Sequence, residues 1–152
     1  MQTRTVEMTV NGKTCSCSVP VTQPLAVVLR DRFRLSTSIS CGEGNCGSCS
    51  VLLDGQPVRS CLMLAVQASG RAVTTVEGLD LQLPRLQKAF CQNHAVQCGF
   101  CAPGFTIAAA ALLQNGSRPS EAEIREGIKG HLCRCSGYAG LVAAILQAAA
   151  DG

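Results

Sequence analysis

The 152-residue sequence predicts an α+β fold, with a sheet and one helix in its first half and four helices in its second. Alternating apolar residues and turn signals fill residues 1–78, whereas helical apolar patterns with capping residues fill residues 79–152. Hydrophobic residues make up 47% of the chain and charged residues only 15%. We therefore expect two small folded domains, 1–78 and 79–152, joined near residues 77–83, with a charge-poor surface that partners partly cover.

The first half is expected to form short strands around one helix. Asn11-Gly12 is a hairpin signal between two alternating segments, and Asp54-Gly55 is a second turn. Residues 22–33 predict a helix capped by Thr22, with Pro24 in its first turn. The segment 34–49 predicts a long loop. Strands are expected at 6–10, 14–19, 50–59 (broken by the second turn) and 72–76.

The second half is expected to form a bundle of short helices. Pro103 suits a helix start, Asn115-Gly116 suits a helix end, and Ser120 with Glu123 has the spacing of a capping box. Four amphipathic or Ala-rich helices of this length can bury their apolar faces only against one another. Helices are expected at 83–93, 103–116, 120–128 and 138–149.

Composition excludes several functional classes and suggests a compartment. The formal net charge of +3, without a basic run and with only 3% aromatic residues, argues against a nucleic-acid surface. No apolar stretch is long enough to span a bilayer, and the N-terminus has no apolar signal region. We therefore expect a cytoplasmic protein. Eleven cysteines in a reducing compartment favour metal ligation over disulfides.

The first group of cysteines lies in the segment SCGEGNCGSCS. The spacing C-x4-C-x2-C, with a fourth cysteine twelve positions further on, is that of a plant-type 2Fe–2S loop. Glycines between the cysteines allow positive φ, so that backbone N–H groups can point at the sulfurs. Structural zinc prefers paired C-x2-C knuckles, which this rhythm does not match. The predicted ligands are Cys41, Cys46, Cys49 and Cys61.

The second group of cysteines lies in QCGFCAPG and HLCRCSGY. The first pair directly precedes the helix expected at Pro103, and the second pair lies between the last two expected helices. Helix N-terminal N–H groups favour the negative charge of thiolates. The spacing alone is compatible with a four-cysteine zinc site or with a second cluster. The predicted ligands are Cys98, Cys101, Cys133 and Cys135.

The motifs together resemble the iron–sulfur subunit of the xanthine oxidase family of molybdenum hydroxylases. CGEGNCGSC, QCGFCAPG and HLCRCSGY occur in the family order, and the resemblance covers about residues 4–148. It implies two 2Fe–2S clusters, one in a plant-ferredoxin-like β-grasp domain and one in a four-helix bundle. His131, Ser48 and Ser136 depart from residues common in such proteins, but no ligand is lost.

The resemblance also implies partner subunits and cofactors. A large subunit would hold a molybdenum-pterin cofactor and a medium subunit FAD, in a heterotrimer or a dimer of heterotrimers. Electrons would pass from molybdenum through the helical-domain cluster and the plant-type cluster to FAD, during hydroxylation of a small organic substrate such as an aldehyde or N-heterocycle. Gln97 and Cys135 match the family residues that lie against the pterin.

Several alternatives are weighed against this interpretation. No nucleophile or acid–base pair is apparent, so the chain itself is expected to be non-catalytic. A freestanding two-cluster ferredoxin would display a charged docking face, and a zinc or thiol-switch protein would lack colour. His131 could suggest a Rieske-type site, but four cysteines already suffice. Cys15 and Cys17 are expected to pack in the core, and Cys91 is expected to be buried.

Overall fold

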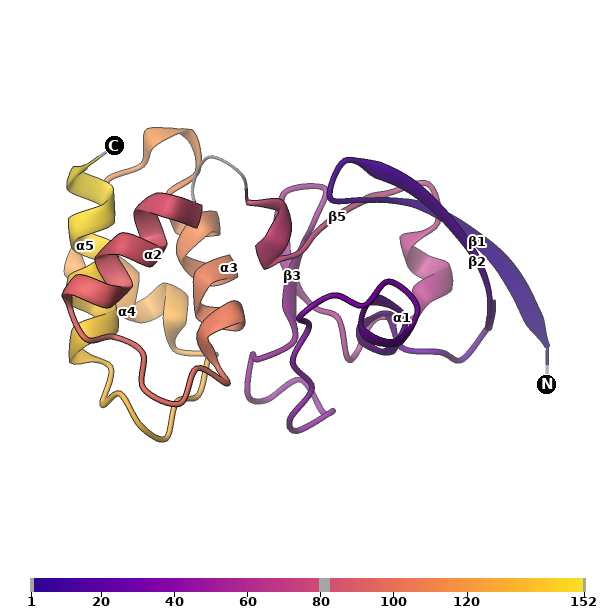
Figure 1. Cartoon of the computed structure of the whole chain (residues 1–152), viewed down its shortest axis with the longest axis horizontal. Helices are drawn as coiled ribbons and strands as arrows, with labels where there is room; N and C mark the ends of the chain where they lie inside the picture. Colours follow the sequence, from indigo (N-terminus) through magenta and orange to yellow (C-terminus); the bar gives the residue numbers. More distant parts are fainter. Residues whose placement is uncertain (1, 80–82, 152) are drawn as a thin grey trace.

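The computed structural model describes residues 2–79 and 83–151 of the chain and confirms a mixed α+β fold. The five-stranded sheet occupies one end of the molecule, with the N-terminus beyond it (Figure 1). Helices α2 to α5 gather at the other end, beside the C-terminus. Residues 80–82 of the expected linker lie outside the described residues, and its first residues form a short 3₁₀ turn, η2 (Val76–Gly78).

The sheet is mixed and has the order β2-β1-β5-β3-β4. β1 pairs antiparallel with β2 and parallel with β5, and β3 pairs antiparallel with β5 and with β4. Both expected hairpin turns are confirmed: Asn11-Gly12 and Asp54-Gly55 have positive φ at all four residues, as tight hairpin turns require. The strands are β1 (Thr3–Val10), β2 (Lys13–Pro20), β3 (Ser50–Leu53), β4 (Gln56–Arg59) and β5 (Ala72–Thr74).

One helix covers the sheet, as predicted, but it is shorter than expected. α1 (Leu25–Asp31) begins after Pro24, which occupies the N-cap without a side-chain hydrogen bond, so the predicted Thr22 cap is wrong. Proline suits this position because its fixed φ presets the chain for the first turn. Leu25 and Leu29 are fully buried against the sheet, together with Val6 and Met8. A 3₁₀ turn, η1 (Ala65–Ala68), closes the same core and was not predicted.

The four expected helices are present with slightly shifted ends. The Ser120 capping box is confirmed: Ser120 N donates to Glu123 Oε2 at 2.7 Å, and Glu123 N donates back to Ser120 Oγ at 3.3 Å. α2 packs on α5, α3 on α4, and α4 on α5. The helices are α2 (Leu83–Gln92), α3 (Ala102–Leu112), α4 (Glu121–Ile128) and α5 (Ala139–Ala150), with the 3₁₀ turn η3 (Gln114–Gly116) after α3.

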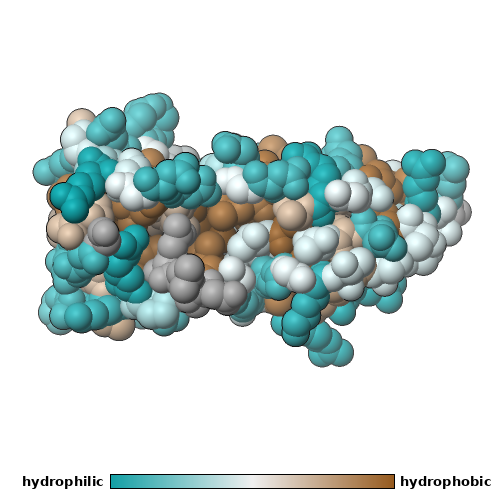
Figure 2. Space-filling view, turned by 90° about the horizontal axis from the view of Figure 1, so that it is seen from above, coloured by the Kyte–Doolittle hydropathy of each residue, from teal (hydrophilic) through white to brown (hydrophobic). Residues whose placement is uncertain are grey.

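The sheet and the helices meet along α3, which packs on β3 and β4. Leu52 of β3 is buried in the apolar core of the helices rather than in that of the sheet. From above, apolar residues gather in the middle of the surface over the helical end, between hydrophilic margins (Figure 2). Within residues 2–79 and 83–151, no helix is long and apolar enough to cross a membrane.

The tightest point of this contact is Gly104, in the first turn of α3. A Cβ at Gly104 would lie 2.5 Å from the carbonyl oxygen of Gly47 and 3.1 Å from Ser48 Cα. Both neighbours are backbone atoms of the cysteine-rich loop, so neither can swing aside. The glycine therefore lets α3 begin directly against that loop.

We predict that Gly104→Ala destabilises the chain by about 1–3 kcal/mol, because the added methyl group overpacks a backbone contact. Gly127→Ala in α4 is the matched control, since its added Cβ would meet only the flexible end of Leu112. Alanine also favours helix over glycine by about 1 kcal/mol. Thermal unfolding of the two variants measures the difference. Equal melting temperatures would contradict the tight contact at Gly104.

Candidate metal centres

The first predicted ligand group comes together around the loop before β3. Cys41, Cys46 and Cys49 lie on this loop, and Cys61 follows β4. The predicted positive φ angles are confirmed at Gly42 (70°), Gly44 (78°) and Gly47 (75°). At Gly47 a side chain would also collide with fixed neighbours, because a Cβ there would lie 2.6 Å from the carbonyl oxygen of Gly130. Glycine is thus required at Gly47 both by the backbone conformation and by the lack of space.

Backbone N–H groups point at the sulfurs of this loop. Glu43 N and Cys46 N each donate to Cys41 Sγ at 3.4 Å. Burial raises the pKa of the Cys46 thiol, but hydrogen bonds from Cys41 and Ser48 outweigh it, and the pKa falls to about 6. Donors of this kind stabilise thiolate, the form in which cysteine binds a metal.

The thiols of the first group lie close to one another. Cys41 is a neighbour of Cys46, and Cys61 has both Cys49 and Cys41 as neighbours. Burial, followed by the neighbouring Cys49, raises the pKa of Cys61 to about 11. Ionising several adjacent thiols is costly because the thiolates repel one another, and a bound cation offsets that cost.

The second predicted ligand group comes together at the start of α3. Cys98 and Cys101 precede that helix, and Cys133 and Cys135 lie between α4 and α5. Cys135 Sγ lies 3.7 Å from Cys98 Sγ, and Cys101 hydrogen-bonds to Cys133. The sulfurs face a hollow of about 450 Å³ that also reaches Cys46 and Ser48 of the first loop.

The segment that carries Cys133 and Cys135 is hydrogen-bonded to Tyr138. Ser136 N donates to Cys133 Sγ at 3.3 Å, and Cys133 N donates to Tyr138 Oη at 2.9 Å. Tyr138 has a φ of 69°, which is unusual for a bulky residue, and its ring packs edge-on against Phe105. Burial raises the pKa of Cys133, but the hydrogen bonds from Ser136 outweigh it and lower the pKa to about 7.

Gln97 and Cys135, which the family resemblance places against the pterin, are hydrogen-bonded neighbours in the structure. Gln97 Nε2 donates to the carbonyl oxygen of Cys135 at 3.1 Å, and both residues are exposed. Their outer position leaves them open to a molecule beside the second group.

His131 and the remaining cysteines play other parts. His131 is buried against Gly47, and its Nε2 lies 2.9 Å from Ser50 Oγ, so the structure gives no support to a Rieske-type role. Burial and then Arg59 lower the pKa of His131 to about 4. Cys15 and Cys17 pack against the sheet core, as predicted. Cys91 is exposed, so the prediction of a buried Cys91 is wrong; it lies on the outward side of α2, beyond buried Phe90.

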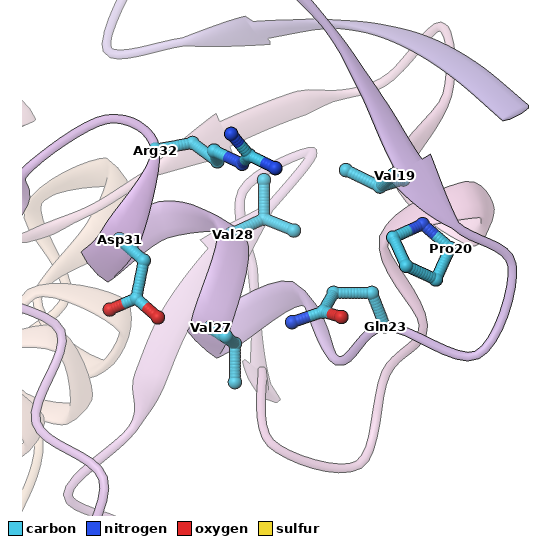
Figure 3. Close-up of a pocket in the computed structure, with 7 residues that line it drawn as sticks. All are labelled: Val19, Pro20, Gln23, Val27, Val28, Asp31 and Arg32. Atoms are coloured by element: carbon cyan, nitrogen blue, oxygen red, sulfur yellow. The ribbon is translucent and has the colours of Figure 1, made fainter. Parts of the chain in front are cut away.

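A further hollow lies on the sheet, away from these groups. It measures about 320 Å³ and is formed by the end of β2 and by α1 (Figure 3). Its walls are mostly aliphatic, with Asp31 and Arg32 at its edge. Because it contains none of the eight predicted ligands, it adds nothing to the metal sites.

The sequence did not reveal how closely the two groups approach each other. Leu132 N donates to the carbonyl oxygen of Cys46 at 2.9 Å, which joins the segment before Cys133 directly to a first-group residue. Arg59 reaches across the same contact, and its Nη2 donates to the carbonyl oxygen of Gly130 at 2.7 Å. Nothing in the sequence indicated this role of Arg59, except that it is a basic residue two positions before the predicted ligand Cys61.

Comparisons with known proteins agree with the two groups of cysteines. Residues 8–73 match the family described as 2Fe-2S iron-sulfur cluster binding domain. Residues 75–146 match the family described as 2Fe-2S binding domain. Each match contains one complete group of four cysteines, so the chain has two 2Fe–2S binding domains.

Similar proteins cover nearly the whole chain. The nicotine 6-hydroxylase small subunit of Paenarthrobacter nicotinovorans is 43% identical over 94% of this chain and 88% of its own length. The xanthine dehydrogenase iron-sulfur-binding subunit of Escherichia coli O157:H7 is 40% identical over 95% and 94%. In the crystal structure of quinoline 2-oxidoreductase from Pseudomonas putida 86, one chain superposes with a TM-score of 0.90 and 43% identity, covering 99% of this chain and 96% of that chain. This chain therefore belongs to the iron–sulfur small subunits of the xanthine oxidase family of molybdenum hydroxylases.

Proposed function

We propose that the chain is the electron-transfer subunit of a molybdenum hydroxylase and carries electrons from a molybdenum-pterin centre to FAD on partner subunits. The observation that carries the proposal is the backbone hydrogen bond from Leu132, next to the predicted ligand Cys133, to Cys46 of the first group. When bound, each 2Fe–2S cluster would supply one-electron chemistry. The chain's own part is to hold eight thiolates, direct N–H groups at them and keep the two groups adjacent.

Each group of thiols is assigned to one cluster. Cys41, Cys46, Cys49 and Cys61 would hold the first. Cys98, Cys101, Cys133 and Cys135 would hold the second in the same way. Gly47, Gly104 and His131 are all buried where the glycine-rich loop meets the start of α3, which holds the two groups in a fixed arrangement.

The finer fold and domain assignments belong to the same proposal. We assign residues 1–78 to a plant-ferredoxin-like β-grasp domain, in which α1 lies across the mixed sheet. We assign residues 79–152 to a four-helix bundle made of α2 to α5. The separate apolar cores of sheet and helices support this division, and so does the change of matching family between residues 73 and 75.

Partner subunits are supported by the placement of exposed apolar side chains. The large hydrophobic residues that are most exposed all lie beside predicted ligands: Leu62 (63%), Leu132 (55%), Phe100 (51%) and Val96 (41%). Exposed apolar residues grouped in this way mark interfaces. We propose a molybdenum-cofactor large subunit at the second group, where Gln97 and Cys135 would face the pterin, and a FAD-binding medium subunit near Leu62.

The subunit assignment is preferred over a freestanding two-cluster carrier. The two relatives described above are named as subunits, and the residues around the ligands are apolar rather than charged. Nicotine, xanthine and quinoline are N-heterocycles, which makes an N-heterocycle the first substrate to test, with aldehydes next. We propose a heterotrimer, or a dimer of heterotrimers, in the cytoplasm, where exposed thiols such as Cys91 stay reduced.

The proposed function predicts the metal content of the complex. Purified from its source without separation of the subunits, the complex should contain about four irons per copy of this chain, together with molybdenum. Elemental analysis measures both. Iron without molybdenum would favour the freestanding carrier, and zinc in place of iron would contradict the assignment of both groups.

Replacing one ligand of the second group should remove one cluster only. We expect Cys135→Ala to lose about two irons per chain and one of two reduced-state EPR signals, because the remaining thiols cannot complete a four-cysteine set. Substrate-dependent reduction of FAD should fail as well. Cys91→Ala is the matched control, since Cys91 is exposed and outside both groups. Normal iron content and turnover in Cys135→Ala would refute the ligand assignment.

The exposed apolar residues should matter for assembly. Phe100→Asp places a charge in the proposed interface, and we expect the chain to separate from the large subunit during size-exclusion chromatography. Iron analysis of the variant separates loss of the interface from loss of the second cluster, because Phe100 lies between the predicted ligands Cys98 and Cys101. Gln87→Asp, at an exposed position of α2, adds the same charge elsewhere. Co-elution of the Phe100→Asp chain with its partners would argue against this interface.

A further inference from the structure

Three polar side chains meet where the two ligand groups touch. Arg59 Nη1 donates to Ser50 Oγ at 2.5 Å and to His131 Nε2 at 3.2 Å, and Arg59 Nη2 donates to the carbonyl oxygen of Gly130 at 2.7 Å. Ser50 Oγ also lies 2.7 Å from the carbonyl oxygen of Gly47. This junction (Ser50, Arg59 and His131) joins the end of the first loop to the segment before Cys133.

The guanidinium of Arg59 keeps its full charge at this junction. Its hydrogen-bond partners are a hydroxyl, an imidazole and a backbone carbonyl, none of which is anionic. Among the described residues, no carboxylate forms a salt bridge with it. A half-buried charge that is hydrogen-bonded but not neutralised acts on its surroundings more strongly than a paired surface charge.

His131 lies against both other members of the junction. Its Nε2 is 3.2 Å from Arg59 Nη1 and 2.9 Å from Ser50 Oγ. His131 is only 5% exposed, and its ring edge packs on Gly47, where an added Cβ would lie 2.6 Å from Cδ2. The imidazole therefore orients Arg59 without adding a second charge.

Each member of the junction is close in sequence to a predicted ligand. Arg59 is two residues before Cys61, Ser50 directly follows Cys49, and His131 is two residues before Cys133. Reduction of a cluster adds one electron to a site that is already anionic. A fixed positive charge nearby favours that reduced form, and net charge and hydrogen bonds are known determinants of cluster potentials.

We propose that Arg59 raises the reduction potential of the first cluster, and that Ser50 and His131 are positioning residues that hold its guanidinium at the junction. The proposal rests on the proposed function. When the clusters are bound, the charge of Arg59 would stabilise the first cluster in its reduced form and so favour its reduction by the second.

The test is a redox titration of the purified complex, in which EPR follows each cluster separately. We expect Arg59→Gln to lower the potential of the first cluster by about 59 mV, an about tenfold change in its one-electron equilibrium. The second cluster should shift less. Arg59→Lys, which keeps the charge, should retain more than half of the effect. Arg4→Gln is the matched control: it removes the same charge from an exposed position in β1, and both potentials should stay unchanged.

Each outcome decides the proposal. An unchanged first-cluster potential in Arg59→Gln overturns it, and so does a fall in Arg59→Lys as large as that in Arg59→Gln. If Arg59→Gln loses iron, Ser50→Ala decides instead: a lowered first-cluster potential supports the proposal, and an unchanged one overturns it. Absence of iron from the unmodified complex would refute the proposed function, whereas two clusters whose potentials ignore Arg59 refute only this inference.

Discussion

The close contact of Gly47 with α3 and with His131 is the constraint on which the rest of the structure depends. Gly104 and Gly47 allow two backbones to approach within a distance that no side chain would permit. That approach brings Leu132 N to the carbonyl oxygen of Cys46 and places the guanidinium of Arg59 between the two halves. The packing of the sheet against the helices is thereby fixed, and Cys46 lines the same hollow as the four cysteines of the second group.

The close packing of the two halves also helps to explain why the chain has few charged residues. Two small domains have thin cores of their own, and here Leu52 of β3 adds to the core of the helices. The surface that remains beside the ligands holds Phe100, Leu132 and Leu62, which would be a liability in a freestanding carrier. Apolar residues thus serve two purposes, the packing between the two halves and the proposed contacts with partner subunits.

The local pattern of the sequence predicted most elements and both ligand groups. Hairpin turns such as Asn11-Gly12 and the Ser120 capping box are short-range features, and each depends on only a few consecutive residues. The cysteine spacing carries similar information, because a loop of fixed length and glycine content can fold around a cluster in few ways. The Thr22 cap was wrong because Pro24 imposes its own backbone angle two residues later. The exposure of Cys91 depends on which side of α2 meets α5, and that is set by tertiary packing.

The junction of Ser50, Arg59 and His131 is the part that local patterns could not predict. Its members are 9, 72 and 81 positions apart, and none has a motif of its own. What brings them together is the packing of α3 on β3, which depends on the absence of a side chain at Gly104. Once that contact exists, a buried imidazole at position 131 needs a donor, and Arg59 needs acceptors. Arg59 and His131 therefore satisfy each other's hydrogen-bonding groups. They do so beside the backbone hydrogen bond that joins Leu132 to Cys46.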